Sequence, residues 1–97
     1  MADYRVRPRA RADLEDIWRY TVETWGQEQA DAYLTEIFAG FDRLARNPKL
    51  GRDAGEIRAG YSRYPAGKHM IFYRQAKRGF VDIVRVLHER MLPERHL

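Results

Sequence analysis

The side chains best suited to chemistry lie in the last third of the sequence. His69, Tyr73, Arg85 and His88 combine two imidazoles, which exchange protons near neutral pH, with a phenol and a guanidinium. RNA cleavage needs such a set, because a base must deprotonate the 2′-hydroxyl, an acid must protonate the leaving oxygen and cations must hold the phosphate. A hydrogen-bonding or surface role explains each histidine as well, so both interpretations stay open.

The charge of the chain is unevenly distributed. The first 57 residues contain nine Lys/Arg and eleven Asp/Glu, whereas residues 58–97 contain nine Lys/Arg and three Asp/Glu. A positive half attracts an anionic partner, such as nucleic acid, an acidic peptide or an acidic patch on a protein. A solvated surface accounts for the same charge without any partner. Charge alone therefore leaves a plain nucleic-acid-binding module as one open hypothesis.

Two segments have the apolar spacing of amphipathic helices. Apolar side chains recur every three or four residues from about Arg9 to Trp25, and again from about Gln27 to Arg46. Gly26 separates the two segments, and Asn47-Pro48 ends the second. With one glycine between them, the helices are expected to fold back as an antiparallel hairpin.

Two groups of side chains in the first helix carry further expectations. Trp18 and Trp25 lie on its apolar stripe and are expected in the core. Asp13, Glu15 and Asp16 are expected in its first turns, where carboxylates meet the positive end of the helix dipole.

Short segments with strand composition flank the helices. They are residues 4–7, 61–64, 69–74 and 80–88, with a loop over residues 49–59. Pro8 and Pro65 are expected to end the first and second of these strands. The last strand is apolar on both sides except at Arg85, so it is expected inside the sheet. The order βααβββ predicts an α+β domain with a mostly antiparallel sheet.

Alternation along the strands predicts which side chains share a face. His69, Ile71 and Tyr73 are expected on one face of their strand. On the last strand, Arg85 and Leu87 are expected on the face opposite to Val84, Val86 and His88.

The composition excludes several classes of site. The 97 residues fit a single domain, residues 1–97. The absence of cysteine excludes disulfides, thiolate metal sites and cysteine nucleophiles. There is no His-x-x-x-His pair, no Gly-x-Ser-x-Gly frame and no glycine-rich phosphate loop, so neither a metal nor a cofactor is expected. The start lacks a secretory signal and no apolar run is long enough to span a membrane, which predicts a cytoplasmic protein without membrane association.

Five segments in a fixed order carry a family resemblance across nearly the whole chain. They read ARADLEDIWRYT, WGQEQADAY, RLARNPKLGR, EIRAGYSRYPAGKHMIFYR and DIVRVLHERMLPERHL. Together they resemble the ParE branch of the RelE/ParE toxins of bacterial toxin–antitoxin systems, and the IVRVLHERM tail is more similar to ParE than to RelE. The resemblance implies the RelE/ParE fold, in which an N-terminal strand and a helical hairpin pack on a small sheet.

The resemblance also implies a function. ParE-type toxins are poisons of DNA gyrase and are neutralised by ParD-like antitoxins, which fold as they bind. This implies a non-enzymatic toxin without stable direct nucleic-acid binding. The alternative is a RelE-like nuclease that cuts mRNA on the ribosome, for which Tyr73, Arg85, His88 and His69 are the nearest equivalents of catalytic residues. The residues expected to contact the antitoxin or the target are Arg58, Arg63, Lys68, His69, Tyr73, Arg74, Arg85, His88, Arg90 and Met91.

Overall fold

A computed structural model describes residues 3–97, apart from the side chain of Arg78. Within residues 3–97 the chain forms two helices, five strands and three short 3-10 turns. In chain order the elements are β1 (Tyr4–Val6), α1 (Pro8–Trp25), α2 (Gln27–Arg46), η1 (Pro48–Leu50), β2 (Arg52–Asp53), β3 (Ser62–Ala66), β4 (His69–Gln75), η2 (Lys77–Gly79), β5 (Val81–His88) and η3 (Pro93–Arg95).

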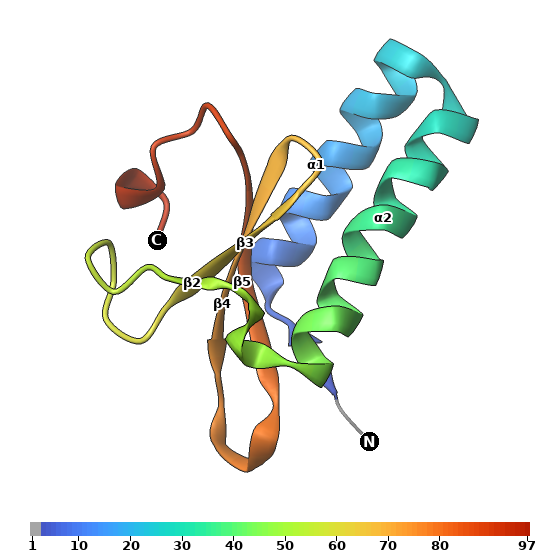
Figure 1. The fold of residues 1–97 in the computed structure, drawn as a ribbon. Helices are drawn as coiled ribbons and strands as arrows, with labels where there is room; N and C mark the ends of the chain where they lie inside the picture. The colour runs from blue at the N-terminus through green and yellow to red at the C-terminus, as the bar shows by residue number, and fades with distance from the viewer. Residues whose placement is uncertain (1–2) are drawn as a thin grey trace.

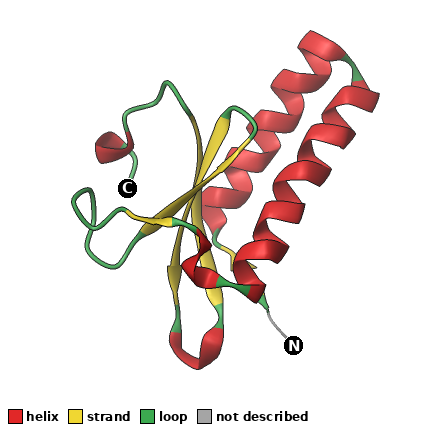
Figure 2. Cartoon of the chain, viewed as in Figure 1, coloured by secondary structure: helices red, strands yellow, loops and turns green. Residues whose placement is uncertain are grey.

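The strands form one sheet in the order β1-β5-β4-β3-β2. β1 pairs in parallel with β5, and the other neighbours are antiparallel. Both helices cover one face of this sheet, and the C-terminal tail lies on the other side (Figures 1 and 2). The α+β fold predicted from the sequence is therefore confirmed, and β5 lies inside the sheet. The short β2 was not predicted, since two residues are too few to show alternation.

Local sequence explains where the helices begin and end. α1 begins at Pro8, whose fixed φ suits the first helical position. Its first turn contains no acidic residue, so Asp13, Glu15 and Asp16 lie beyond the turn in which the interaction with the helix dipole is strongest. Gly26 has a φ of 92°, a conformation that favours glycine, and it lets the chain reverse directly into α2. Asn47 ends α2, and its side-chain oxygen accepts a hydrogen bond from the Lys49 N–H.

Two hydrophobic clusters lie on opposite faces of the sheet. The larger lies between the helices and the sheet, with Phe41, Ile37 and Ile83 among its members. The smaller consists of four buried side chains with partly buried ones around them, and it lies on the face of Phe72 and Leu87. Its buried members are Ala54, Tyr61, Phe72 and Leu87.

The two tryptophans do not lie in the core. Trp18 is 40% exposed and Trp25 is 70% exposed. The Trp18 indole N–H donates to Asp31 on α2. The apolar stripe of α1 was correctly recognised, but the side that faces the sheet consists of the smaller residues Ala10, Leu14 and Ile17. The prediction of buried tryptophans was therefore wrong.

Two details of the strands also differ from expectation. β3 runs through Pro65 to Ala66 because β2 pairs only with Ser62 and Arg63, so no neighbour on that side needs a proline N–H. The register of β4 and β5 shifts between Phe72 and Tyr73. This irregularity places Val84 against the smaller cluster, with Leu87 rather than opposite to it.

Within the described residues, neither helix is both long and apolar enough to cross a membrane.

Candidate functional site

Tyr73 is buried and its hydroxyl is used in the fold. The residue is 1% exposed and belongs to the cluster beneath the helices. Its hydroxyl donates to the Pro48 carbonyl at 2.6 Å and accepts the Gly51 N–H at 3.0 Å. Burial raises the pKa of this phenol. Tyr73 thus fixes the connection between α2 and β2 and does not project from the surface of the sheet.

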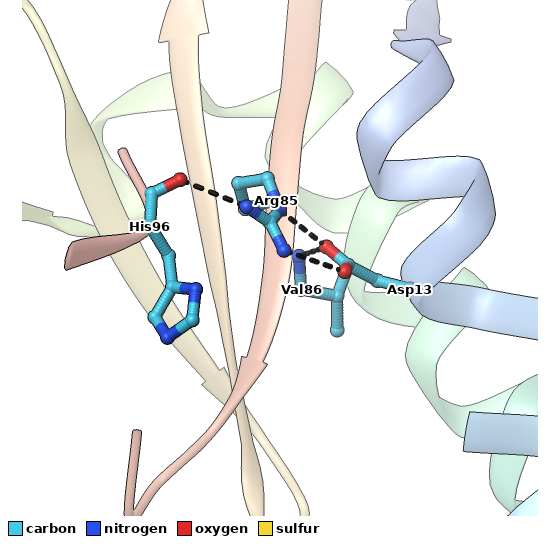
Figure 3. A network of polar contacts seen from close by, with 4 residues as sticks. All are labelled: Asp13, Arg85, Val86 and His96. Atoms are coloured by element: carbon cyan, nitrogen blue, oxygen red, sulfur yellow. Dashed lines mark hydrogen bonds and ion pairs between the residues drawn. The ribbon is translucent and has the colours of Figure 1, made fainter. Parts of the chain in front are cut away.

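Arg85 lies at the centre of a polar network (Figure 3). Its Nε and Nη2 atoms each donate to the Asp13 carboxylate at 2.8 Å, which is a bidentate pair. Its Nη1 atom donates to the His96 carbonyl at 2.8 Å. These hydrogen bonds to Asp13 raise the pKa of Arg85, whose residue is 8% exposed.

Asp13 also completes the edge of β5. The Val86 N–H donates to this carboxylate at 2.9 Å (Figure 3). β1 pairs with β5 only as far as Ile83, so the side chain of Asp13 accepts a hydrogen bond that a longer β1 would take. The Asp13 carboxylate therefore accepts hydrogen bonds both from the buried Arg85 guanidinium and from a backbone N–H at the edge of β5.

His69 forms the second polar cluster, at the other end of β4. The Tyr33 hydroxyl lies 2.6 Å from His69 Nδ1 and also accepts the Lys68 N–H at 2.9 Å. The donor in the Tyr33–His69 contact depends on the imidazole tautomer, and a neutral ring with its proton on Nε2 accepts the hydroxyl proton at Nδ1. Burial, and then the neighbouring His88, lowers the pKa of His69 to about 4.

His88 is the cross-strand partner of His69. The two rings meet edge to face with their centroids 5.3 Å apart. His88 Nδ1 accepts the Arg90 N–H at 3.2 Å, at the point where β5 ends and the tail begins. The pairing of β4 with β5 therefore brings His69 and His88 together.

The remaining candidate residues lie nearer the solvent. Arg58 is exposed with its guanidinium 5.7 Å from the centre of the Tyr61 ring, and Arg63 is 4.0 Å from Glu56. Lys68 lies in the exposed turn between β3 and β4. Arg74 is exposed and pairs with Asp82, while Arg90 and Met91 are exposed at the start of the tail. These candidates form no single cluster, because they are distributed between β3, two turns, β4 and the tail.

Three polar residues important to these clusters were not predicted. Asp82 is buried and binds Arg5 at 2.9 Å and Arg74 at 3.3 Å, which lowers the pKa of its carboxyl, mostly through the hydrogen bond from Arg5. Asp13 and Tyr33 are the other two. An acidic residue inside an otherwise apolar strand was a signal for Asp82, whereas the helices gave none for Asp13 or Tyr33. Among the described residues, no three His, Asp or Glu side chains are grouped to hold a metal ion.

Comparisons of the sequence and of the fold with known proteins define the class to which this chain belongs. The family model for the ParE toxin of type II toxin–antitoxin systems, parDE, matches residues 4–93. The protein Toxin ParE1 of Mycobacterium tuberculosis is 48% identical over 94 residues, covering 97% of this chain and 96% of that protein. Toxin ParE1 of Caulobacter vibrioides is 44% identical over 97 residues, covering 100% and 99%. A solved structure described as the chromosomal ParDE TA system from P. aeruginosa has a similar fold, with a TM-score of 0.77 at 20% identity over 91% of this chain and 96% of that one.

The chain belongs to the ParE toxin family of type II toxin–antitoxin systems. The family predicted from the five sequence segments is thereby confirmed.

Proposed function

We propose that this protein is a non-enzymatic toxin that poisons DNA gyrase and is neutralised by a ParD-like antitoxin. The observation that supports a non-enzymatic role most directly is the engagement of the candidate catalytic residues. Tyr73 is buried in hydrogen bonds to the backbone, and Arg85 is held by Asp13 and the tail. Neither side chain is free to meet a phosphate without breaking these contacts.

His69 is a poor general base for the same reason. A catalytic base works best with a pKa near the working pH, whereas the pKa of His69 is about 4. Its Nδ1 atom already lies within hydrogen-bonding distance of Tyr33. His88 is partly buried as well, and one imidazole supplies either the acid or the base but not both at once.

Two surfaces support an antitoxin as the partner. The helical hairpin exposes several large apolar residues, which suit contact with apolar side chains of a partner. They are Trp18, Tyr20, Trp25 and Phe38. The basic half of the chain suits acidic residues on the same partner. The tail adds exposed Met91 and Leu92, so it is a further candidate for contact with the antitoxin or the target.

The alternative is a RelE-like ribosome-dependent nuclease, favoured by the adjacent His69 and His88 rings. A paired assay on the purified protein separates the two functions. One arm measures gyrase supercoiling and trapped cleaved DNA, and the other measures mRNA cleavage on programmed ribosomes. We expect gyrase inhibition with intact mRNA, and we expect His88→Ala to remain toxic with an unchanged circular dichroism spectrum. Cleaved mRNA with unaffected gyrase would overturn the proposal.

A further inference from the structure

Two arginines face each other across the edge of the sheet. Arg52 on β2 is the register partner of Arg63 on β3. Like charges directly opposite each other on neighbouring strands destabilise a sheet. The ion pairs among residues 3–97 do not include Arg52, and Arg63 has only Glu56 at 4.0 Å. The nearby Asp53 accepts a hydrogen bond from the Gly55 N–H in its own turn.

These two arginines line a surface groove of about 500 Å³. The groove lies beside the connection from α2 to β2, and its lining combines the two arginines with apolar and aromatic side chains. Leu50, Tyr64, Pro65 and Met70 supply the apolar part. Its volume is within the range of about 300–1,000 Å³ that is typical of ligand pockets.

The backbone beside the groove limits how a partner binds there. β2 begins at Arg52 and pairs only with Ser62 and Arg63, so β3 from Tyr64 onward has no strand beside it on that side among the described residues. Pro65 on that edge has no N–H to donate, which prevents an added strand from continuing a regular ladder. A partner is therefore held here by its side chains. Two adjacent guanidiniums select a carboxylate, and Leu50 and Met70 select an aliphatic neighbour.

We propose that this groove binds an acidic protein segment, in which a carboxylate bridges Arg52 and Arg63 and an adjacent aliphatic side chain packs on Leu50 and Met70. The assignment of this segment to the antitoxin rests on the proposed function. The opposed arginines are then explained, since the bound carboxylate neutralises a repulsion that the free protein retains. The groove is separate from the exposed aromatic residues of the helical hairpin, so it would form a second point of attachment.

The test uses overlapping synthetic peptides that span the C-terminal half of the antitoxin encoded beside this gene. Binding to the full chain is measured by calorimetry for the wild type, Arg52→Glu, Arg63→Glu and the control Arg9→Glu. Arg52→Glu creates an opposite-charge pair with Arg63 and should fold with a Tm at or above the wild type. Arg63→Glu creates the same cross-strand pair but also replaces the exposed contact with Glu56 by a repulsion, so its Tm should stay close to that of the wild type. The control makes the same change of charge at an exposed position of α1.

We expect one acidic peptide to bind the wild type and the control equally, and both groove variants about tenfold more weakly or worse. Failure of every peptide to bind the wild type, or equal binding by all four proteins, would overturn the inference. Binding of a single-stranded oligonucleotide that depends on both arginines, without peptide binding, would assign the groove to nucleic acid instead. Neutralisation of toxicity by the whole antitoxin in growing cells tests the proposed function separately, because it does not require this groove.

Discussion

The two faces of the sheet are covered in different ways. Two long helices cover one face, over a cluster that joins residues of both helices, β1, β4 and β5. The other face carries a cluster with four buried side chains, beneath the C-terminal tail and the connection from β2 to β3. Since stabilisation grows with the apolar area buried, the helix-covered face should open only on global unfolding, and the tail-covered face should open first.

Arg85 connects these two faces. It binds Asp13 of α1 on one side and the His96 carbonyl of the tail on the other (Figure 3). Arg85, a candidate catalytic residue in the sequence, thus holds α1 and the tail together through its hydrogen bonds. The predictions below perturb the two faces separately.

The largest effect is expected from Asp13→Ala. This change leaves the buried Arg85 guanidinium unpaired and removes the acceptor of the Val86 N–H. Breaking a buried pair from one side costs about 3–5 kcal/mol, so the free energy of unfolding in urea should fall by that amount. The control is Asp16→Ala, which removes an exposed pair with Arg19 and should cost roughly 0–1 kcal/mol. Similar losses for both variants would contradict a special role for the Asp13 network.

The next effect is expected from Tyr73→Phe. The ring stays in the core, but the Pro48 carbonyl and the Gly51 N–H lose their partner. Leaving these groups unsatisfied should cost about 2 kcal/mol in thermal or urea unfolding. Tyr64→Phe is the matched control, since no hydrogen bond of its hydroxyl occurs within residues 3–97, and it should cost less than about 0.5 kcal/mol. If the folded Tyr73→Phe variant stays toxic, the result agrees with a non-enzymatic toxin. Loss of toxicity in the folded variant would contradict that function.

Acid should destabilise the protein through His69. The pKa of this imidazole is about 4 in the fold and 6.5 in its absence, so the unfolded chain binds more protons between these values. Stability should fall as the pH drops from about 6.5 to 4, by roughly 1–2 kcal/mol because the ring is only half-buried. Tyr33, Lys68 and His88 surround the ring, and the charges of Asp13 and Glu89 partly offset the effect.

The measurement is the Tm between about pH 7 and pH 2 for the wild type and His69→Gln. The variant should lose this part of the pH dependence while it keeps the loss below pH 4. That lower loss comes from Asp82, whose carboxyl has a lowered pKa and contributes stability only while it is ionised. An identical pH profile for both proteins would rule out His69 as the titrating group.

The smallest effect is expected on the tail-covered face. Leu97 packs against the smaller cluster, whereas Leu92 is half exposed. Leu97→Ala should cost about 1 kcal/mol, and Leu92→Ala should be close to neutral. Hydrogen exchange should quicken in the tail and around the connection from β2 to β3, with the helices unchanged. Faster exchange in α1 and α2 as well would mean that the two faces open together.

Much of the fold could be predicted because it depends on local patterns. The period of apolar residues located both helices within one residue of their observed bounds, and Gly26 and Asn47 marked their ends. The segments of strand composition gave the βααβββ order, to which the structure adds only the short β2. The ordered segments identified the family, which the family model and the relatives confirmed.

The use of the candidate side chains was decided by the tertiary structure. Arg85 is paired with a carboxylate because α1 packs beside β5 and brings Asp13 to it. The sequence patterns of α1 and β5 do not show how these two distant elements pack. The exposure of Trp25 depends likewise on the hairpin extending beyond the sheet (Figure 1). Sequence thus determined the elements and the family, since these follow from local periodicity and ordered motifs. Only the packing of distant elements determined which polar groups are neutralised inside the fold and which remain on its surface.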